Sequence, residues 1–290
     1  MSFPVAVGLA LAVGTAFTSV VGFLYKHRGA VASPPVKMSR PIRSSLELFR
    51  SGAYVLGILI ATASWGLHVG ALSLAPISLV QSVIAGGLVL LTVTADRLFG
   101  HEVTRREWIG VALAAAGLAF LAATIGDTAH SAHASYATAR LVPYIALAAG
   151  AGLAIAAAAP TGPRQGPVLG IAAGLLWAAS DTSIKALSGD LGDGAAAVLL
   201  HPLAAFVALA SFAGLVVSAR SLQVGRAVPV IALTSVAANV VTIAAGPVVF
   251  EEPLPQTTVG IAVRLLAFAL VVTAAALTPA PARLAEPAEA

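Results

Sequence analysis

Long apolar segments alternate with short polar stretches along almost the whole chain. Nine such segments can be marked, at residues 4–25, 51–72, 76–95, 107–125, 141–159, 167–187, 199–219, 228–250 and 256–277. About 20 apolar residues in helical form cover the hydrocarbon core of a bilayer. An isolated strand cannot satisfy its backbone hydrogen bonds in lipid, so each segment is expected to be a helix. The pattern predicts an all-α, polytopic membrane helix bundle with about nine transmembrane helices.

Composition and charge placement strengthen this prediction. Hydrophobic residues make up 59% of the chain and charged residues only 10%, against about 25% charged in a typical soluble protein. The sequence has no cysteine, which excludes disulfides, thiolate catalysis and Cys-ligated metals. The pI is near 9.9, but the basic residues gather at the ends of apolar segments instead of forming one patch. This distribution is typical of membrane topology and predicts a lipid bilayer, not nucleic acid, as the partner.

The basic residues also predict an orientation. If the first loop is cytoplasmic, 13 of the 16 Lys and Arg residues lie on the cytoplasmic side. The other three are Arg140 on an outer loop and Lys185 and Arg264 within helices. Positive charge favours the cytoplasmic side of a membrane. The expected arrangement is therefore a multi-pass protein of the plasma (inner) membrane, with its N-terminus outside and its C-terminus in the cytoplasm.

An odd number of spans predicts an inverted 4+1+4 repeat, the plan of many secondary transporters. At an offset of 150 positions, Glu102 and Gly110 align with Glu252 and Gly260, each Glu just ahead of an apolar segment. The predicted units are a first four-helix repeat, a linking helix with its loops, a second four-helix repeat and a disordered tail, at residues 1–125, 126–166, 167–278 and 279–290.

Three charged residues lie inside predicted spans. Asp181 and Lys185 are one helical turn apart, so they can pair directly, and Arg264 lies in the last span. A charge at the centre of a membrane helix costs at least about 2.5–3.5 kcal/mol on insertion scales, and such residues usually mark a pathway or a partner. Asp181 and Arg264 share a depth of roughly 9–12 Å, which predicts contact between them. One carboxylate with two cations would favour an anionic or zwitterionic solute. A structural ion pair with a snorkelling lysine is the alternative.

Uncharged polar residues supply weaker candidates. His68 lies between glycines at G-x-x-x-G spacing, Gln81 is early in the third span, and Asn239 belongs to a polar stripe in the eighth. For each of them alone, interhelical hydrogen bonding is the favoured explanation. No nucleophile–base pair, phosphate-binding loop or metal-ligand spacing is present, so no enzyme activity, catalytic residue, metal or cofactor is expected. The expected substrate-binding or coupling residues are Asp181, Lys185, Arg264, Asn239, His68 and Gln81.

Two motifs, ALSLAPISLVQS and HEVTRREWIGVALAAAGLAFL, resemble the drug/metabolite transporter superfamily (EamA type), in which a similar pattern recurs in each half and belongs to helices around a central cavity. The layout is most similar to the NIPA-type magnesium transporters, which share nine spans, a basic first loop, the Ala75-Pro76 pair, Lys185 and the His201-Pro202 pair. Those proteins have Gly-Glu where this chain has Ser64-Trp65. The resemblance thus implies the fold more directly than it implies magnesium, since a hard cation prefers several oxygen ligands.

Three functions follow as hypotheses. The leading one is a secondary transporter of the drug/metabolite type that moves a small polar solute by alternating access. The second is a NIPA-like transporter of magnesium or another divalent cation, and the third is a non-transporting membrane scaffold. The expected partners are a small polar solute or ion and the lipid bilayer, with a homodimer open as an assembly state.

Overall fold

The computed structural model describes residues 2–36, 41–86, 105–124, 130–225 and 227–277, and all regular secondary structure within them is helical. The long helices are α1 (Phe3–Val31), α3 (Gly52–Leu74), α5 (Arg105–Ala123), α6 (Thr138–Ala157), α7 (Gln165–Leu187), α9 (Pro202–Val224), α10 (Ala227–Val249) and α11 (Thr258–Leu277). Shorter elements are α2 (Pro41–Leu46), α8 (Ala195–Leu200), a helix at Ile77–Gly86 and two 3-10 turns at Glu47–Arg50 and Ser188–Asp193.

The predicted all-α membrane bundle is confirmed in its coarse form. Five helices, α1, α3, α6, α7 and α9, are long and apolar enough to cross a membrane. Shorter apolar helices occupy the other predicted spans, at Ile77–Gly86, Trp108–Leu121, Leu233–Val249 and Thr258–Ala274. Nine spans therefore stay a prediction. The rest of the third span, Glu102 and the tail at 279–290 lie outside the described residues.

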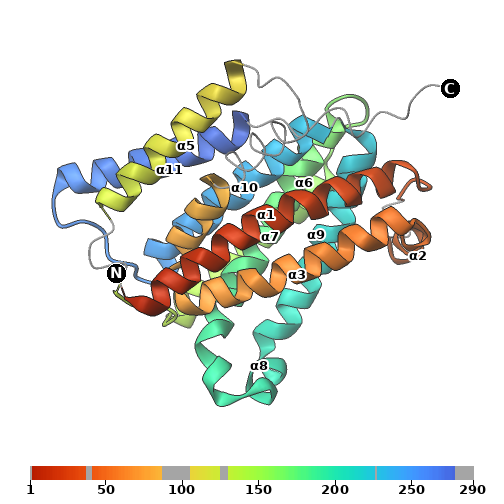
Figure 1. The fold of residues 1–290 in the computed structure, drawn as a ribbon. Coiled ribbons are helices and arrows are strands. Elements are labelled where there is room, and N and C mark those ends of the chain that lie inside the picture. The colour runs from red at the N-terminus through yellow and green to blue at the C-terminus, as the bar shows by residue number, and fades with distance from the viewer. Residues whose placement is uncertain (1, 37–40, 87–104, 125–129, 226, 278–290) are drawn as a thin grey trace.

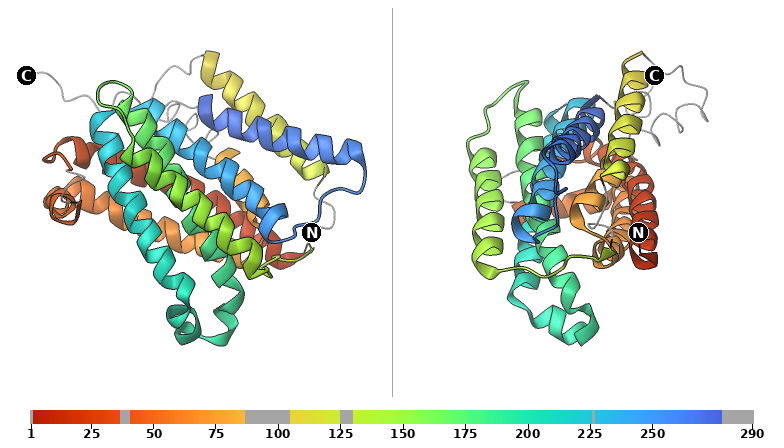
Figure 2. Two further views of the ribbon diagram at one scale, coloured as in Figure 1. Left: turned by 180° about the vertical axis from the view of Figure 1, so that it is seen from behind. Right: turned by 90° about the vertical axis from the view of Figure 1, so that its left-hand side faces the viewer.

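Helix α7 forms the centre of the bundle. It packs against α6, α9 and α10, whereas α1 packs mainly on α3 and α5 on α11 (Figure 1). The left view of Figure 2 shows α5 and α11 side by side at one edge. In α7, 67% of the most apolar window is buried, against 28–39% in the other four long apolar helices. Polar side chains of α7 are therefore placed to meet several other helices.

One end of the bundle, named here the Pro76 end, gathers four chain segments. Helix α3 ends at Leu74 and the helix Ile77–Gly86 begins just after Pro76. Hydrogen bonds bring the end of α7 and the connection after α10 to the same place, through Lys185 and Glu252 respectively. At the opposite end, Gln223 of α9 ties down the loop after α1: its carbonyl oxygen accepts from the Val36 N–H at 2.7 Å and its amide donates to two carbonyl oxygens.

Glycines let α7 and α10 approach closely. A Cβ atom added at Gly174 would clash with the Thr234 carbonyl oxygen and lie 2.8 Å from the Ala237 Cβ. One turn earlier, a Cβ at Gly170 would lie 3.0 Å from the Val230 carbonyl oxygen. Close backbone contact of this kind stabilises the association of membrane helices through van der Waals packing. The hydrophobic effect contributes little to that association, because lipid tails are as apolar as the helix surfaces.

This contact gives a stability prediction. Gly174→Val is expected to lower the free energy of unfolding by about 1–3 kcal/mol, because it overpacks the α7–α10 contact. The matched control is Gly150→Ala in α6, where nothing lies within 4 Å of the added atom. That change should be neutral or stabilising by up to about 1 kcal/mol through helix propensity. Thermal unfolding of the purified variants in detergent measures both, and equal effects would contradict the close approach.

Candidate functional site

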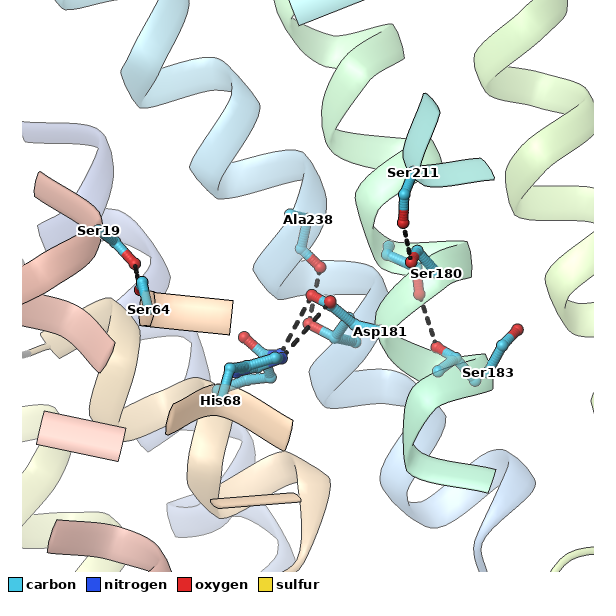
Figure 3. Close-up of polar contacts among 12 residues, drawn as sticks. Ser19, Ser64, His68, Ser180, Asp181, Ser183, Ser211 and Ala238 are labelled. Atoms are coloured by element: carbon cyan, nitrogen blue, oxygen red, sulfur yellow. Dashed lines mark hydrogen bonds and ion pairs between the residues drawn. The ribbon is translucent and has the colours of Figure 1, made fainter. Parts of the chain in front are cut away.

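Three polar side chains from three helices meet beside α7. The His68 Nε2 of α3 lies 3.4 Å from the Asp181 Oδ1, and the Gln81 Nε2 lies 3.4 Å from the Asp181 Oδ2. Figure 3 shows His68 and Asp181 pointing toward each other across the space between their helices. We call His68, Gln81 and Asp181 the Asp181 cluster. The sequence singled out all three residues, but did not predict that they lie together.

The atoms of the cluster have complementary roles. Asp181 has an acceptor oxygen for each neighbour: the Gln81 amide donates to one, and the His68 Nε2 donates to the other in the tautomer that carries its proton on Nε2. The Gln81 amide nitrogen also lies 3.5 Å from the His68 Nε2. Both distances to the carboxylate exceed the usual 2.7–3.2 Å for N–H···O bonds. The carboxylate therefore keeps acceptor capacity for a further donor.

The Asp181 carboxylate is reachable. The Asp181 side chain keeps 20% exposure, while that of His68 keeps 9% and Gln81 as a residue keeps 4%. Asp181 lies six residues before the end of α7 at Leu187, which is roughly 9 Å of helix. A water-sized molecule can thus touch a carboxylate that is set well inside the most buried helix. The His68 Nδ1 is buried and has no hydrogen-bond partner among the described residues.

Lys185 does not pair with Asp181, contrary to the expectation from their spacing. Its side chain is fully buried, at 0% exposure, and the ammonium donates to the carbonyl oxygens of Leu72 at 2.6 Å and Ala75 at 2.9 Å and to that of Ala132. The Leu72 carbonyl would normally accept from the residue four positions later, which is Pro76 and has no N–H. Lys185 supplies the missing donor and uses all three of its own.

Arg264 also has other partners than the one expected. Its Nε donates to the Thr124 hydroxyl at 2.9 Å, which links α11 to the end of α5. No ion pair joins Arg264 to Asp181 within the described part of the chain. The expected positive cluster of Asp181, Lys185 and Arg264 is therefore wrong, because each cation is held by oxygen atoms of a different helix end.

The remaining candidates are placed as follows. Asn239 is buried in α10, where its carbonyl accepts from the Thr242 hydroxyl at 3.4 Å, and no hydrogen bond between described residues joins its side chain to the Asp181 cluster. The His201 Nδ1 accepts from the Leu203 N–H at 3.1 Å and caps α9. Within the described ranges, no group of three or more His, Asp or Glu side chains is placed to hold a metal ion.

Glu252 is a candidate that the sequence interpretation missed. It lies between the last two predicted spans, yet it is 4% exposed and its Oε1 accepts from the Ser78 N–H at 3.3 Å. Burial raises the pKa of its carboxyl, while its hydrogen bonds to Ser78 and Ile77 and the Lys185 charge oppose that shift. The signal that could have found it is the alignment of Glu252 with Glu102 at the 150-residue offset.

Comparison of this chain with known proteins, whether through family models, curated sequences or solved structures, finds no match.

Proposed function

We propose that this protein is a secondary transporter of the drug/metabolite type, which moves a small polar solute across the membrane by alternating access. The observation that carries the proposal is the Asp181 cluster. An acidic, an imidazole and an amide side chain from three helices converge inside an apolar bundle, and one of them remains reachable. Ionisable residues within membrane helices are costly and usually serve a pathway or a bound solute.

The cluster lies where an inverted repeat would place a substrate site. His68 and Gln81 belong to the first half of the proposed 4+1+4 plan and Asp181 to the second. Transporters of this plan bind their solute between the repeats, so that rocking of one half against the other exposes the site to each side in turn. A solute held by Asp181 and His68 would touch both halves.

Two serine pairs support the repeat itself. The Ser19 and Ser64 hydroxyl oxygens lie 2.8 Å apart and join α1 to α3, the first two helices of the first half. The Ser180 and Ser211 hydroxyl oxygens, also 2.8 Å apart, join α7 to α9, the first two helices of the second half (Figure 3). Under the proposed 4+1+4 plan these two helix pairs correspond, and a hydroxyl contact in each is what two copies of one four-helix unit would give.

At both ends of the bundle, hydrogen bonds join the two halves of the proposed repeat. At the Pro76 end, Lys185 and Glu252 of the second half bind the backbone of the first. At the opposite end, Gln223 of the second half binds the loop after α1. Alternating access requires contacts that close one end while the other opens, and these hydrogen bonds join the two halves at both ends.

The chemistry of the cluster indicates the class of solute. With Lys185 and Arg264 held elsewhere, the charge at the site is that of a carboxylate beside an imidazole and an amide. Asp181 accepts hydrogen bonds and attracts positive charge. A polar solute with an ammonium or hydroxyl donor fits these groups. This preference for a donor replaces the preference for an anionic or zwitterionic solute that was inferred from the sequence.

Uptake by proteoliposomes tests the transporter. Purified protein is reconstituted and challenged with radiolabelled panels of amines, amino acids, polyols and divalent cations. Saturable uptake of at least one donor-bearing solute, above that of protein-free liposomes, is the expected result. Saturable uptake of divalent cations alone would favour the NIPA-like alternative, and no saturable uptake across the panel would favour a scaffold.

Topology gives a separate prediction. Nine spans with the N-terminus outside and the C-terminus in the cytoplasm are expected from the 13 of 16 basic residues on one side. Fusions of a periplasmic and a cytoplasmic reporter to the two termini should give opposite signals. Matching signals would mean an even number of spans and would exclude the inverted 4+1+4 plan.

A further inference from the structure

Glu252 is a buried carboxylate separate from the Asp181 cluster. It lies in the connection from α10 to α11, directly after Glu251, whose φ of 52° is in the left-handed region that side chains other than glycine rarely adopt. The Glu252 N–H donates to the Gly246 carbonyl at 3.1 Å. This sharp turn folds the Glu252 side chain back onto α10, where its Oε2 packs directly against Gly246.

Only half of this carboxylate is satisfied. The Oε1 accepts from the Ser78 N–H at 3.3 Å, but the Oε2 is buried and has no hydrogen-bond partner among the described residues. Buried carboxylates with a purely structural role normally have both oxygens bonded, because an unpartnered charged oxygen is expensive to bury. A protonated carboxyl in the same place carries no charge and costs less.

Several charged groups surround Glu252. Lys185 of α7 and Arg264 of α11 both interact with it electrostatically. The Ser78 amide faces it from the helix Ile77–Gly86, while Arg140 of α6 is engaged by the neighbouring Glu251 at 2.7 Å. Burial raises the pKa of Glu252, against its hydrogen bonds to Ser78 and Ile77 and the positive charge. Access of water to this end would remove the burial that raises the pKa of Glu252, and would so favour release of its proton.

Building on the transporter function above, we propose that Glu252 is a proton-coupling residue of this carrier, protonated while the Pro76 end is closed and ionised when that end opens to water. The only chemistry is uptake of one proton from water by the carboxylate and its later return. A carboxyl whose pKa is higher buried than hydrated binds its proton more tightly in the closed state. Acid therefore favours the closed Pro76 end and alkali favours its opening.

Cysteine labelling tests this without any knowledge of the solute, because the chain has no cysteine of its own. Ser188→Cys places a thiol at the end of α7, where the native side chain is 8% exposed and donates to the Lys185 carbonyl at 2.6 Å. Ala196→Cys places a reference thiol on exposed α8. The full-length single-cysteine proteins in nanodiscs are labelled with a charged maleimide across a pH series. The ratio of the two labelling rates reports opening and cancels the ionisation of the thiol itself.

The expected result is a ratio that rises as pH rises, by up to about tenfold per pH unit for one linked proton. In the Glu252→Gln background, which mimics the protonated carboxyl, the ratio should be low at every pH. Glu251→Gln is the matched control, since that side chain is 66% exposed, and it should keep the wild-type pH response. Glu252→Asp should keep a response with a moved midpoint.

The proposal is overturned if Glu252→Gln responds to pH like the wild type, or if the wild-type ratio does not change with pH. If Glu252→Gln fails to fold, the Glu252→Asp variant decides, because an unchanged midpoint would show that another group titrates. The labelling is independent of the transport assay. A labelling ratio that depends on pH, without uptake of any solute, would support the proton switch and reject the transporter. Solute uptake with a labelling ratio that does not change with pH would support the transporter and reject the proton switch.

Discussion

Asp181→Asn is expected to lower the initial rate of solute uptake in proteoliposomes by about a hundredfold or more. Asparagine keeps the size of the side chain but removes the charge that His68 and Gln81 contact and that the proposed solute would bind. A hydrogen bond to a charged group contributes up to about 3 kcal/mol, and about 1.4 kcal/mol corresponds to a factor of ten in binding. The measurement is the initial rate for the solute identified in the panel assay, at matched protein content.

Asp190→Asn is the control for this change. Asp190 lies in the 3-10 turn Ser188–Asp193 beyond the end of α7, so the same loss of a carboxylate occurs outside the bundle and should leave uptake unchanged. Circular dichroism and size-exclusion profiles check that both variants fold. Wild-type uptake by Asp181→Asn would mean that the carboxylate is structural and that the solute site lies elsewhere, for instance along Asn239.

The helices could be predicted from the sequence, because span length and hydropathy are set by the bilayer and depend little on tertiary contacts. The sixth predicted segment, 167–187, agrees with α7 at Gln165–Leu187 within two residues at its start. Depth was likewise predictable, since each residue advances a helix by about 1.5 Å. The similar depths of His68, Gln81 and Asp181 follow from counting residues from the ends of their segments.

The partners of the charged residues could not be predicted in this way. The depth of a residue in the membrane does not determine the rotation of its helix about the helix axis. Asp181 and Arg264 have similar depths, but Asp181 faces α3 and the helix Ile77–Gly86. For Lys185, the i, i+4 spacing to Asp181 competes with backbone carbonyls left without donors at the end of α3. Pro76 has no N–H and so leaves one of these carbonyls without a donor. That this carbonyl lies within reach of Lys185 follows only from the packing of α7 beside α3.

Glu252 shows a further reason for the limits of the sequence. An acidic residue just past an apolar span is normally solvated, and its neighbour Glu251 is indeed exposed. The left-handed turn at Glu251 reverses the chain and places Glu252 in the interior. The sequence Glu-Glu-Pro does not predict this conformation. The burial of Glu252 therefore results from the turn. Its side chain packs against Gly246, which has no side chain to obstruct it.

Lys185→Met is expected to destabilise the protein by about 3–5 kcal/mol, the typical effect of removing one partner of a buried charged group. Methionine fills much of the same volume but donates no hydrogen bond, so the Leu72, Ala75 and Ala132 carbonyls lose the donor that holds them together. Glu252 also loses a neighbouring positive charge. Thermal or denaturant unfolding of the purified protein in detergent measures the change.

Lys26→Met is the matched control. Lys26 is also largely buried, at 9% exposure, but its ammonium lies 4.2 Å from the centre of the Phe23 ring. A cation–π contact contributes about 0.5–2 kcal/mol, so this change should cost clearly less than Lys185→Met. A loss of less than about 1 kcal/mol for Lys185→Met would mean that the carbonyls find other donors.

The combination of Lys185→Met with Glu252→Gln separates the two roles of the lysine. If Lys185 stabilises the protein only through the three carbonyls, the effects of the two substitutions should add. If its charge also compensates a buried carboxylate, the double variant should be more stable than the sum by at least about 0.5 kcal/mol. This coupling should vanish in acid, where a protonated Glu252 no longer needs a cation beside it.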